Sequence, residues 1–390
     1  MTDIETTLKA AADALRCGDA RSARENFGRA IAAGRSDTAT LMGMALACRA
    51  TGDHENVLSA TDRLLKADPR NVRALILRGD ALAARNESRS ASSFYLAALR
   101  TAASAGQPPA DLAPELDRVR RACEQLAADY SSYLLDRMRR HGFDPQRSSS
   151  RFSQSLDIVL GKKKIYLQEP KYYYFPGLPQ LQFYDDHAAF PWIPALEQAT
   201  ATIREELLQV VNEPGAFAPY VTGDANRAAK TQAGMLNNPD WSAFYLWKNG
   251  EPVAANAARF PATMRALDAV PLSVVPNRSP SILFSLLRPG AHIPPHNGLV
   301  NTRLICHLPL IVPGRCTFRV GNDLRQWSEG KVWLFDDTIE HEAWNETDRT
   351  RIILLFDVWR PELSAEEKVL VVSLFEAIDA HDGRKPEWSI

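Results

Sequence analysis

The chain has 390 residues, of which 45% are apolar and 24% charged, and this length is enough for two or three globular domains. Its formal net charge of -1 gives no electrostatic reason to expect nucleic acid or an anionic membrane as a partner. No apolar stretch approaches the roughly 20 residues that span a bilayer, and the five scattered cysteines include no CxxC pair. We therefore expect a soluble protein of the reducing cytoplasm, without a disulfide framework or a thiolate zinc site, that binds a small molecule or another protein.

The sequence pattern of the first hundred residues repeats about every 34 residues. This offset aligns the small residues Ala11, Ala45 and Gly79, the larger residues Phe27, Thr61 and Tyr95, and the turn residues Gly18, Gly52 and Asn86. Helix–turn–helix units of about 34 residues are typical of tetratricopeptide repeats, and we predict three of them in residues 1–104. Such repeats stack into a superhelix whose concave surface holds a peptide or a partner protein. An unrelated Ala-rich helical bundle is the alternative, because its apolar periodicity would be similar.

The repeat pattern breaks at Gln107-Pro108-Pro109. The segment from Asp111 to Arg140 then has the periodicity of one long helix, which could cap the repeats. The residues from His141 to Arg151 are rich in Gly, Pro and Ser and predict a linker. The expected organisation is repeats in 1–104, a capping helix and linker in 105–155, and a second domain in 156–390.

The second domain differs in composition from the first, since all eight tryptophans lie at or beyond Trp192. The segment from Ile193 to Val211 has helical periodicity. A β pattern follows in five short segments, residues 281–287, 303–311, 316–320, 331–335 and 351–359. Strands at this spacing predict a sandwich or a jelly-roll barrel. A Ser-x-x-Glu capping box at Ser364 and Glu367 predicts a closing helix that runs to Ala380.

Two histidines lie where a ligand could reach them. His296 is in a turn-rich segment just before a strand, and His341 lies near the end of another strand. Arg351 follows ten residues after His341, at the start of a basic strand. A lone histidine is more often a surface or core residue than a metal ligand, so the surrounding motifs decide.

Those motifs resemble the aspartyl/asparaginyl β-hydroxylases, which are iron(II)- and 2-oxoglutarate-dependent oxygenases. In order, they are Tyr174-Phe175-Pro176-Gly177, Asp240-Trp241-Ser242, Ser285 with Pro289-Gly290, His296-Asn297-Gly298, Asn301-Thr302-Arg303, His307, Trp327-Ser328-Glu329-Gly330-Lys331, Glu340-His341-Glu342, Arg351 and Asp357-Val358-Trp359. The resemblance runs from about Phe175 to Glu367, roughly half of the chain. It implies a double-stranded β-helix of the jelly-roll, cupin-like kind with flanking helices.

The resemblance also implies that His296 and His341 hold the iron, with no catalytic side chain beyond these metal ligands. Most oxygenases of the wider group add a carboxylate two residues after the first histidine. Here that residue is Gly298, and this family is known for lacking the carboxylate and completing the coordination with water. A zinc site is the alternative, but two histidines alone make a poor closed tetrahedral site. We interpret Asp336 and Asp337 as a strand-end turn that orients His341.

By the same resemblance, Ser285, His307 and Arg351 bind the cosubstrate 2-oxoglutarate, with the arginine fork on its distal carboxylate. Strand alternation places Arg303, Ile305 and His307 on one face of their strand. Arg303 is assigned to the carboxylate of the substrate. Ile305 stands where the animal β-hydroxylases have a second arginine, which loosens the assignment to an aspartyl or asparaginyl substrate.

The implied activity is hydroxylation of an aspartyl, asparaginyl or related residue in a peptide or protein. Iron(II) is the bound metal, 2-oxoglutarate and O2 are consumed, and succinate and CO2 are released. The repeat region would deliver the substrate to the oxygenase domain. Two alternatives stay open. One is the same chemistry on a small metabolite, a free amino acid or a lipid acyl chain, and the other is a non-catalytic repeat scaffold that binds a ligand without turnover.

Overall fold

The computed structural model divides the chain into two compact units, residues 1–160 and 161–390. Within these units it describes residues 4–104, 106, 110–222, 234 and 236–382. In the described ranges, no hydrophobic cluster combines side chains of both units. Each unit therefore has a core of its own.

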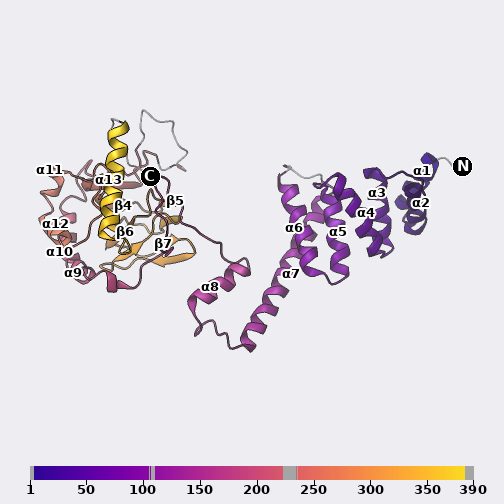
Figure 1. Ribbon diagram of the computed structural model, residues 1–390, viewed down its shortest axis with the longest axis horizontal. Coiled ribbons are helices and arrows are strands. Elements are labelled where there is room, and N and C mark those ends of the chain that lie inside the picture. The colour runs from indigo at the N-terminus through magenta and orange to yellow at the C-terminus, as the bar shows by residue number, and fades with distance from the viewer. Residues whose placement is uncertain (1–3, 105, 107–109, 223–233, 235, 383–390) are drawn as a thin grey trace. The chain divides into compact units, whose positions relative to one another are not determined.

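Three helix hairpins make up most of the N-terminal unit (Figure 1). Their first helices are α1 (Ile4–Arg16), α3 (Thr38–Ala50) and α5 (Val72–Ala84), and their second helices are α2 (Ala20–Ala32), α4 (His54–Ala67) and α6 (Ser88–Ser104). Corresponding helices begin at the same offset at which the sequence repeats. The prediction is confirmed in its coarser form, as a helical N-terminal region that resembles tetratricopeptide domains.

The turns inside these hairpins use the residues that the repeat offset aligned. Gly18, Gly52 and Asn86 have φ values of 82°, 72° and 62°, a left-handed conformation that glycine adopts freely and asparagine tolerates. Asp19 and Asp53 come next, and each caps the following helix by accepting a hydrogen bond from the backbone amide three residues on. The turn chemistry thus fixes where each second helix begins.

Helix α7 (Ala113–Arg140) packs on the last hairpin, as expected for a cap. Its buried residues, Leu116 and Val119, belong to the cluster that α5 and α6 form. A short helix, α8 (Ser150–Val159), follows and buries no residue. The N-terminal unit ends at Leu160, so the predicted domain start at residue 156 falls inside α8.

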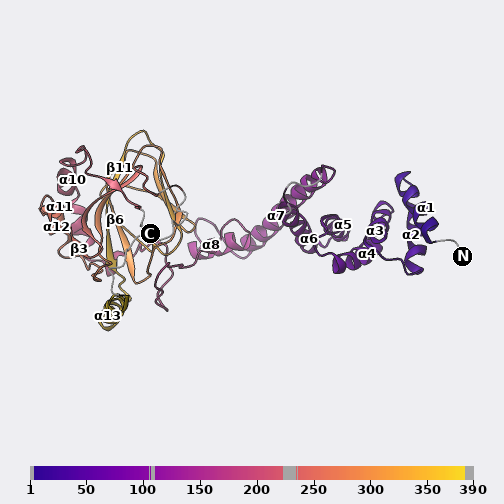
Figure 2. The same ribbon diagram turned by 90° about the horizontal axis from the view of Figure 1, so that it is seen from above.

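Two antiparallel sheets form the centre of the C-terminal unit. The larger has the strand order β1-β2-β4-β11-β6-β9, with β3 beside β2, and the smaller has the order β5-β10-β7-β8. The strands are β1 (Ala218–Pro219), β2 (Trp241–Lys248), β3 (Glu251–Pro252), β4 (Ile282–Leu287), β5 (His292–His296), β6 (Arg303–Ile311), β7 (Cys316–Val320), β8 (Asp323–Gln326), β9 (Trp333–Phe335), β10 (His341–Asn345) and β11 (Arg351–Trp359). Figure 2 shows these strands curving around a common interior.

The larger sheet has one face toward helices and one toward the smaller sheet. On β6, Leu304, Cys306 and Leu308 are buried in a cluster with residues of the helices α9 (Ile193–Gln198), α10 (Thr200–Leu208) and α12 (Pro261–Leu267). Ile305 belongs instead to the cluster that both sheets share. The two-residue alternation predicted for this strand is confirmed, and it directs the polar residues of β6 into the space between the sheets.

Six of the strands in the two sheets were not predicted: β1, β2, β3, β5, β8 and β10. In β5, Pro294 and Pro295 gave the turn signal that concealed the strand. Proline is tolerated there because β5 lies at the edge of its sheet, where one side of the strand needs no donors.

The single helix predicted from Ile193 to Val211 is two helices, α9 and α10, which meet at Ala199. The remaining helices are η1 (His187–Ala189), α11 (Ala254–Ala257) and α13 (Ala365–Asp382). The capping box of α13 is confirmed: the Ser364 amide donates to the Glu367 carboxylate at 2.8 Å, and the Glu367 amide donates to the Ser364 hydroxyl at 3.2 Å. None of the helices in the described ranges is long and apolar enough to cross a membrane.

Candidate functional site

The two predicted metal ligands face each other. His296 ends β5 and His341 begins β10, and the two residues are direct partners in the antiparallel pairing of these strands. Their ring centroids are 4.1 Å apart. Strand pairing thus brings together two imidazoles that lie far apart in the sequence, and both line the same pocket.

Each of these imidazoles is held by its Nδ1 atom. Nδ1 of His296 lies 2.8 Å from the carbonyl oxygen of Pro294, and Nδ1 of His341 lies 3.1 Å from that of Ile339. A carbonyl can only accept, so Nδ1 carries the hydrogen in both rings and Nε2 keeps its lone pair. This is the arrangement in which a backbone partner orients a histidine for metal binding through the other nitrogen.

Burial keeps both rings in the neutral form that binds metal. It lowers the pKa of His296 to about 4 and that of His341 well below its usual range. A protonated imidazole would have no lone pair to offer, so at neutral pH both residues are available as ligands.

No third ligand accompanies the two histidines. Among the residues that the structure describes, no group of three or more His, Cys, Asp or Glu side chains could hold a metal ion. A Cβ atom at Gly298 would overlap the carboxylate of Asp337, which therefore occupies the space that a side chain at position 298 would need. Two imidazoles with open positions fit a divalent iron site better than a closed zinc site.

Arg351 lies at the inner end of the pocket. Its side chain is 1% exposed, donates from Nη1 to the carbonyl oxygen of Ser285 at 3.2 Å, and lies over the ring of Trp327 at 4.7 Å. No carboxylate pairs with it in the described part of the chain, and its Nε has no partner. Burial lowers the pKa of Arg351 to about 10, which still leaves it a cation at neutral pH.

Other hydrogen-bonding groups beside Arg351 are also incomplete. The Ser285 hydroxyl accepts from the indole nitrogen of Trp241 at 3.2 Å, which leaves its own hydrogen to donate. His307 Nδ1 and Trp327 Nε1 are buried without a partner. Burial, followed by the charge of Arg351, holds the pKa of His307 well below its usual range. This end of the pocket therefore offers donors to an anion.

The opposite end of the pocket has a different charge pattern. Arg351 and Asp357 point from the same face of β11 and are six residues apart, which is about 20 Å along a strand. Asp357 Oδ1 lies 2.9 Å from Arg303 Nη1, and Asp337 Oδ2 lies 3.4 Å from Arg303 Nη2. Burial raises the pKa of Asp337 to about 7, although Arg303 opposes the shift. Arg303 is thus already paired with two carboxylates.

Aromatic side chains form one wall of this outer end. Tyr220 stacks on Trp241 with a centroid distance of 4.2 Å, and its other neighbour is Tyr245 at 6.4 Å. Lys248, which is exposed, lies over the Tyr245 ring at 5.2 Å. All four residues line the pocket, and the exposure of Lys248 marks the side that opens to solvent.

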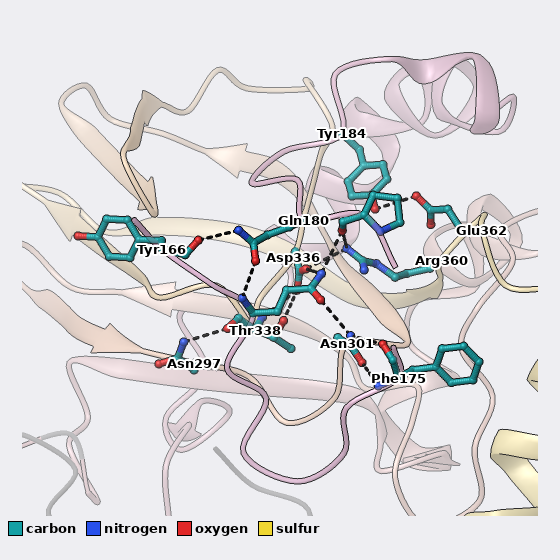
Figure 3. Close-up of polar contacts among 12 residues, drawn as sticks. Tyr166, Phe175, Gln180, Tyr184, Asn297, Asn301, Asp336, Thr338, Arg360 and Glu362 are labelled. Carbon is teal, nitrogen blue, oxygen red and sulfur yellow. Dashed lines mark hydrogen bonds and ion pairs between the residues drawn. The ribbon is translucent and has the colours of Figure 1, made fainter. Parts of the chain in front are cut away.

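A strap, residues 166–184, crosses the two segments that contain Asn297 and Thr338, which are the loop after His296 and the turn before His341 (Figure 3). The Glu169 amide donates to the carbonyl oxygen of Thr338 at 2.8 Å, and the Lys171 amide donates to that of Gly298 at 3.0 Å. The side-chain amide of Asn297 also donates to Thr338, at 2.9 Å. The strap thereby links the loop after His296 to the turn before His341.

A buried ion pair anchors the strap. Asp336 and Arg360 are 0% exposed and are joined at 2.9 Å. The Gln168 amide of the strap donates to Asp336 at 2.7 Å, and Arg360 donates to the strap carbonyl of Pro179 at 3.1 Å (Figure 3). Asp336 also accepts from the amide and hydroxyl of Thr338. The interpretation of Asp336 as part of a turn that orients His341 fits these contacts.

The six residues assigned from the sequence all line one pocket: Ser285, His296, Arg303, His307, His341 and Arg351. The sequence reasoning did not assign a pocket role to Asp337, Asp357 or Trp327, although each lies in a motif that it identified. It also missed Tyr220, which no local pattern distinguishes from a surface tyrosine. Only the strand pairing brings these residues to the site.

Comparisons with known proteins find similarity in the same part of the chain. Residues 197–361 match the family model described as Aspartyl/Asparaginyl beta-hydroxylase. The human aspartyl/asparaginyl beta-hydroxylase is 35% identical over 178 residues, which cover 45% of this chain and 22% of that protein. The ornithine lipid ester-linked acyl 2-hydroxylase of Rhizobium tropici is 35% identical over 179 residues, which cover 45% of this chain and 60% of that protein. The aspartate beta-hydroxylase domain-containing protein 2 of Xenopus tropicalis is 31% identical over 212 residues, which cover 54% of this chain and 55% of that protein.

The chain thus spans less than two thirds of the length of each of these relatives. Among solved structures, the TPR2B-domain:pHsp70 complex of yeast Sti1 is similar to 31% of this chain and 96% of that chain, at 20% identity and a TM-score of 0.28. The family match and the pocket lie in the same part of the molecule. The C-terminal unit of this chain is therefore similar to the aspartyl/asparaginyl β-hydroxylase family over residues 197–361.

Proposed function

We propose that this protein is an iron(II)- and 2-oxoglutarate-dependent hydroxylase whose C-terminal unit is a double-stranded β-helix, the jelly-roll arrangement of cupin-like proteins. The strand order supports this fold. From β4 to β11 the chain passes between two sheets, so that β4, β6, β9 and β11 are neighbours in one sheet and β5, β7, β8 and β10 in the other. Two facing four-stranded layers connected in this way are the pattern of a jelly roll.

The observation that carries the proposed activity is the unpaired, buried charge of Arg351. An isolated buried charge costs several kcal/mol, so we expect an anionic ligand to complete the site. 2-Oxoglutarate fits because one carboxylate can accept from the Arg351 fork and from the Ser285 hydroxyl. Its other end is then available to a metal on His296 and His341, with His307 beside it.

Iron(II), 2-oxoglutarate and O2, when bound, supply the oxidative chemistry, which converts a substrate C–H bond to C–OH and releases succinate and CO2. The side chains supply binding and orientation. The Pro294 and Ile339 carbonyls hold the histidine rings with Nε2 free, and the aromatic walls keep water away from the reacting centre.

For the substrate, we propose an aspartyl, asparaginyl or related residue of a peptide or protein, which the repeat region docks. The concave surface of stacked helix hairpins is suited to an extended peptide. The second candidate, a lipid acyl chain or another small molecule, is favoured by the similarity to a relative named as an acyl 2-hydroxylase. The paired histidines and the unpaired Arg351 disfavour a non-catalytic scaffold. The five free cysteines are consistent with the proposed cytoplasmic location.

Anaerobic calorimetry with manganese(II) and 2-oxoglutarate tests the assignment of the site. We expect His296→Ala to lose metal binding and, with iron(II) and O2, to lose succinate formation. Arg351→Met should keep metal binding but weaken 2-oxoglutarate binding by about a hundredfold, because a charge-assisted pair to the ligand disappears. Arg349→Met, at an exposed arginine just before β11, is the matched control and should bind normally.

Succinate formation by His296→Ala, or unchanged 2-oxoglutarate affinity in Arg351→Met, would contradict this proposal. The substrate is then sought by adding O2 and a cell-extract peptide pool to the loaded protein. A mass gain of one oxygen atom in a peptide identifies the product. A gain found only in lipid or small-molecule fractions would favour the second candidate.

A further inference from the structure

The outer end of the pocket, which we call the mouth, holds more negative than positive groups. It is formed by Arg303, Ile305, Asp337 and Asp357. All four side chains are buried and line the pocket. Arg303 is ion-paired with Asp357 at 2.9 Å and with Asp337 at 3.4 Å. Asp357 also accepts the Ser281 amide at 2.7 Å, which fixes its orientation. The only cation among these four residues is therefore already matched.

Ile305 does not offset this excess of negative over positive groups. It lies between Arg303 and His307 on the inner face of β6, directly opposite Asp357 of β11 and Phe335 of β9. An apolar side chain at this position adds no charge to the mouth. Lys248 lies further out and is exposed, so water screens its ammonium group.

The formal charges of the site with iron(II) and 2-oxoglutarate bound indicate which substrate group the mouth can accept. The positive charges are two from iron(II) and one each from Arg351 and Arg303. The negative charges are two from 2-oxoglutarate, one from Asp357 and a partial charge from Asp337, because burial raises the pKa of Asp337 to about 7. The positive excess is therefore less than one charge, so a substrate carboxylate entering the mouth would be buried without a full counter-ion, which is unfavourable.

The mouth nevertheless has two unsatisfied hydrogen-bonding atoms. Arg303 Nε is a buried donor without a partner, and Asp337 Oδ1 is a buried acceptor without a partner. Leaving such atoms unpaired is costly, so a ligand that satisfies both is favoured. An amide group has a carbonyl oxygen to accept and an N–H to donate, whereas an ionised carboxylate can only accept.

Building on the proposed function, we propose that the mouth selects a substrate that presents an uncharged amide group and discriminates against a carboxylate, with Ile305 as the specificity-determining residue. A second cation at position 305 would supply the counter-ion that a carboxylate needs. The reaction itself is unchanged, and only the group accepted beside the metal differs.

Two matched peptide libraries test this inference on the full-length protein with iron(II), 2-oxoglutarate and O2. The flanking residues are random and identical in both, and the central residue is Asn or Gln in one library and Asp or Glu in the other. Mass spectrometry counts the peptides that gain one oxygen atom. We expect the wild-type protein to favour the amide library by at least about tenfold, since an unpaired buried charge is costly.

The Ile305→Arg variant should shift this ratio toward the acidic library by at least about tenfold. Asp337→Asn, which removes a negative charge with almost no change in shape, should shift it in the same direction and serves if Ile305→Arg fails to fold. Ile305→Leu is the matched control and should keep the wild-type preference. Binding of manganese(II) and 2-oxoglutarate is measured for each variant first.

A wild-type preference for the acidic library would overturn the inference, as would an unchanged ratio in folded variants. Oxidation of neither library, with 2-oxoglutarate binding intact, would also overturn it, because the amide would then not be accepted. Absence of 2-oxoglutarate binding in the wild-type protein is a separate result. It would mean that the proposed function itself is wrong.

Discussion

Gly298 leaves the space that the Asp337 carboxylate fills. In most oxygenases that hold iron with two histidines and a carboxylate, the carboxylate lies two residues after the first histidine. That position is Gly298 here, and a carboxylate from another segment, Asp337, lies beside its backbone. The two residues are also joined through the backbone, because the Gly298 amide donates to the Asp337 carbonyl at 2.6 Å. The close packing therefore requires glycine at this position.

Gly298→Ala should destabilise the C-terminal unit by about 1–3 kcal/mol, because the new methyl group must displace a buried carboxylate. Urea unfolding followed by tryptophan fluorescence measures this unit selectively, since all eight tryptophans lie in it. The added substitution Asp337→Ala should recover part of the loss. An equal loss in the double variant would show that the overlap is not the cause.

The residues of the site could be predicted to different degrees. His296, His341 and Arg351 lie in short motifs, so the sequence was sufficient to select them. The pairing of Arg303 with Asp337 and Asp357 could not be predicted, because it depends on contacts between segments that are far apart in the chain. The assignment of Arg303 to a substrate carboxylate did not take these partners into account, and the observed pairs favour a different role.

At the scale of elements, the strap and the edge strand β5 hold in place the two histidines that we propose as metal ligands. The strap contributes backbone hydrogen bonds to both loops, and the Asp336–Arg360 pair holds the strap. Alternation within β6 and β11 was predictable because it is a local pattern of period two. The strap was not, because its partners are more than a hundred residues away and it has no regular structure of its own.

Arg360→Met should destabilise the C-terminal unit by about 3–5 kcal/mol, because it leaves the Asp336 carboxylate buried without a counter-ion. Manganese(II) affinity should fall as well, since the turn before His341 loses its anchor. The double variant Arg360→Met with Asp336→Leu removes both charges and should recover much of the stability. If the double variant is no more stable than the single one, the buried charge is not the source of the effect.

At the scale of the whole molecule, the chain combines two units with cores of their own, a helical repeat region and a unit that is similar to the hydroxylase family. Helix α7 packs on α6, so a truncation that removes the repeats but keeps α7 would expose Leu116 and Val119. A truncation at the unit boundary after Leu160 removes α7 together with the repeats and avoids this exposure. The fixed offset between repeats was sufficient to predict the hairpins, because each hairpin is a local structure.

A truncated protein that begins at Gly161 should fold and bind manganese(II) and 2-oxoglutarate as the full chain does, because the pocket lies entirely in the second unit. If the repeats dock the substrate, its kcat/KM for a peptide found with the full chain should fall at least about tenfold, mainly through KM. Short peptides that cannot reach the repeats should be oxidised equally by both proteins. Unchanged kcat/KM for the long peptide would exclude delivery by the repeats.

The two prolines of β5 have a further consequence for how a polypeptide can approach. An open sheet edge can recruit an extended peptide as an additional strand, with main-chain hydrogen bonds as the source of affinity. Pro294 and Pro295 have no backbone N–H to donate from this edge strand beside His296, which disfavours such recruitment. The proposed protein substrate would therefore present a projecting side chain, rather than align its backbone along this edge of the sheet.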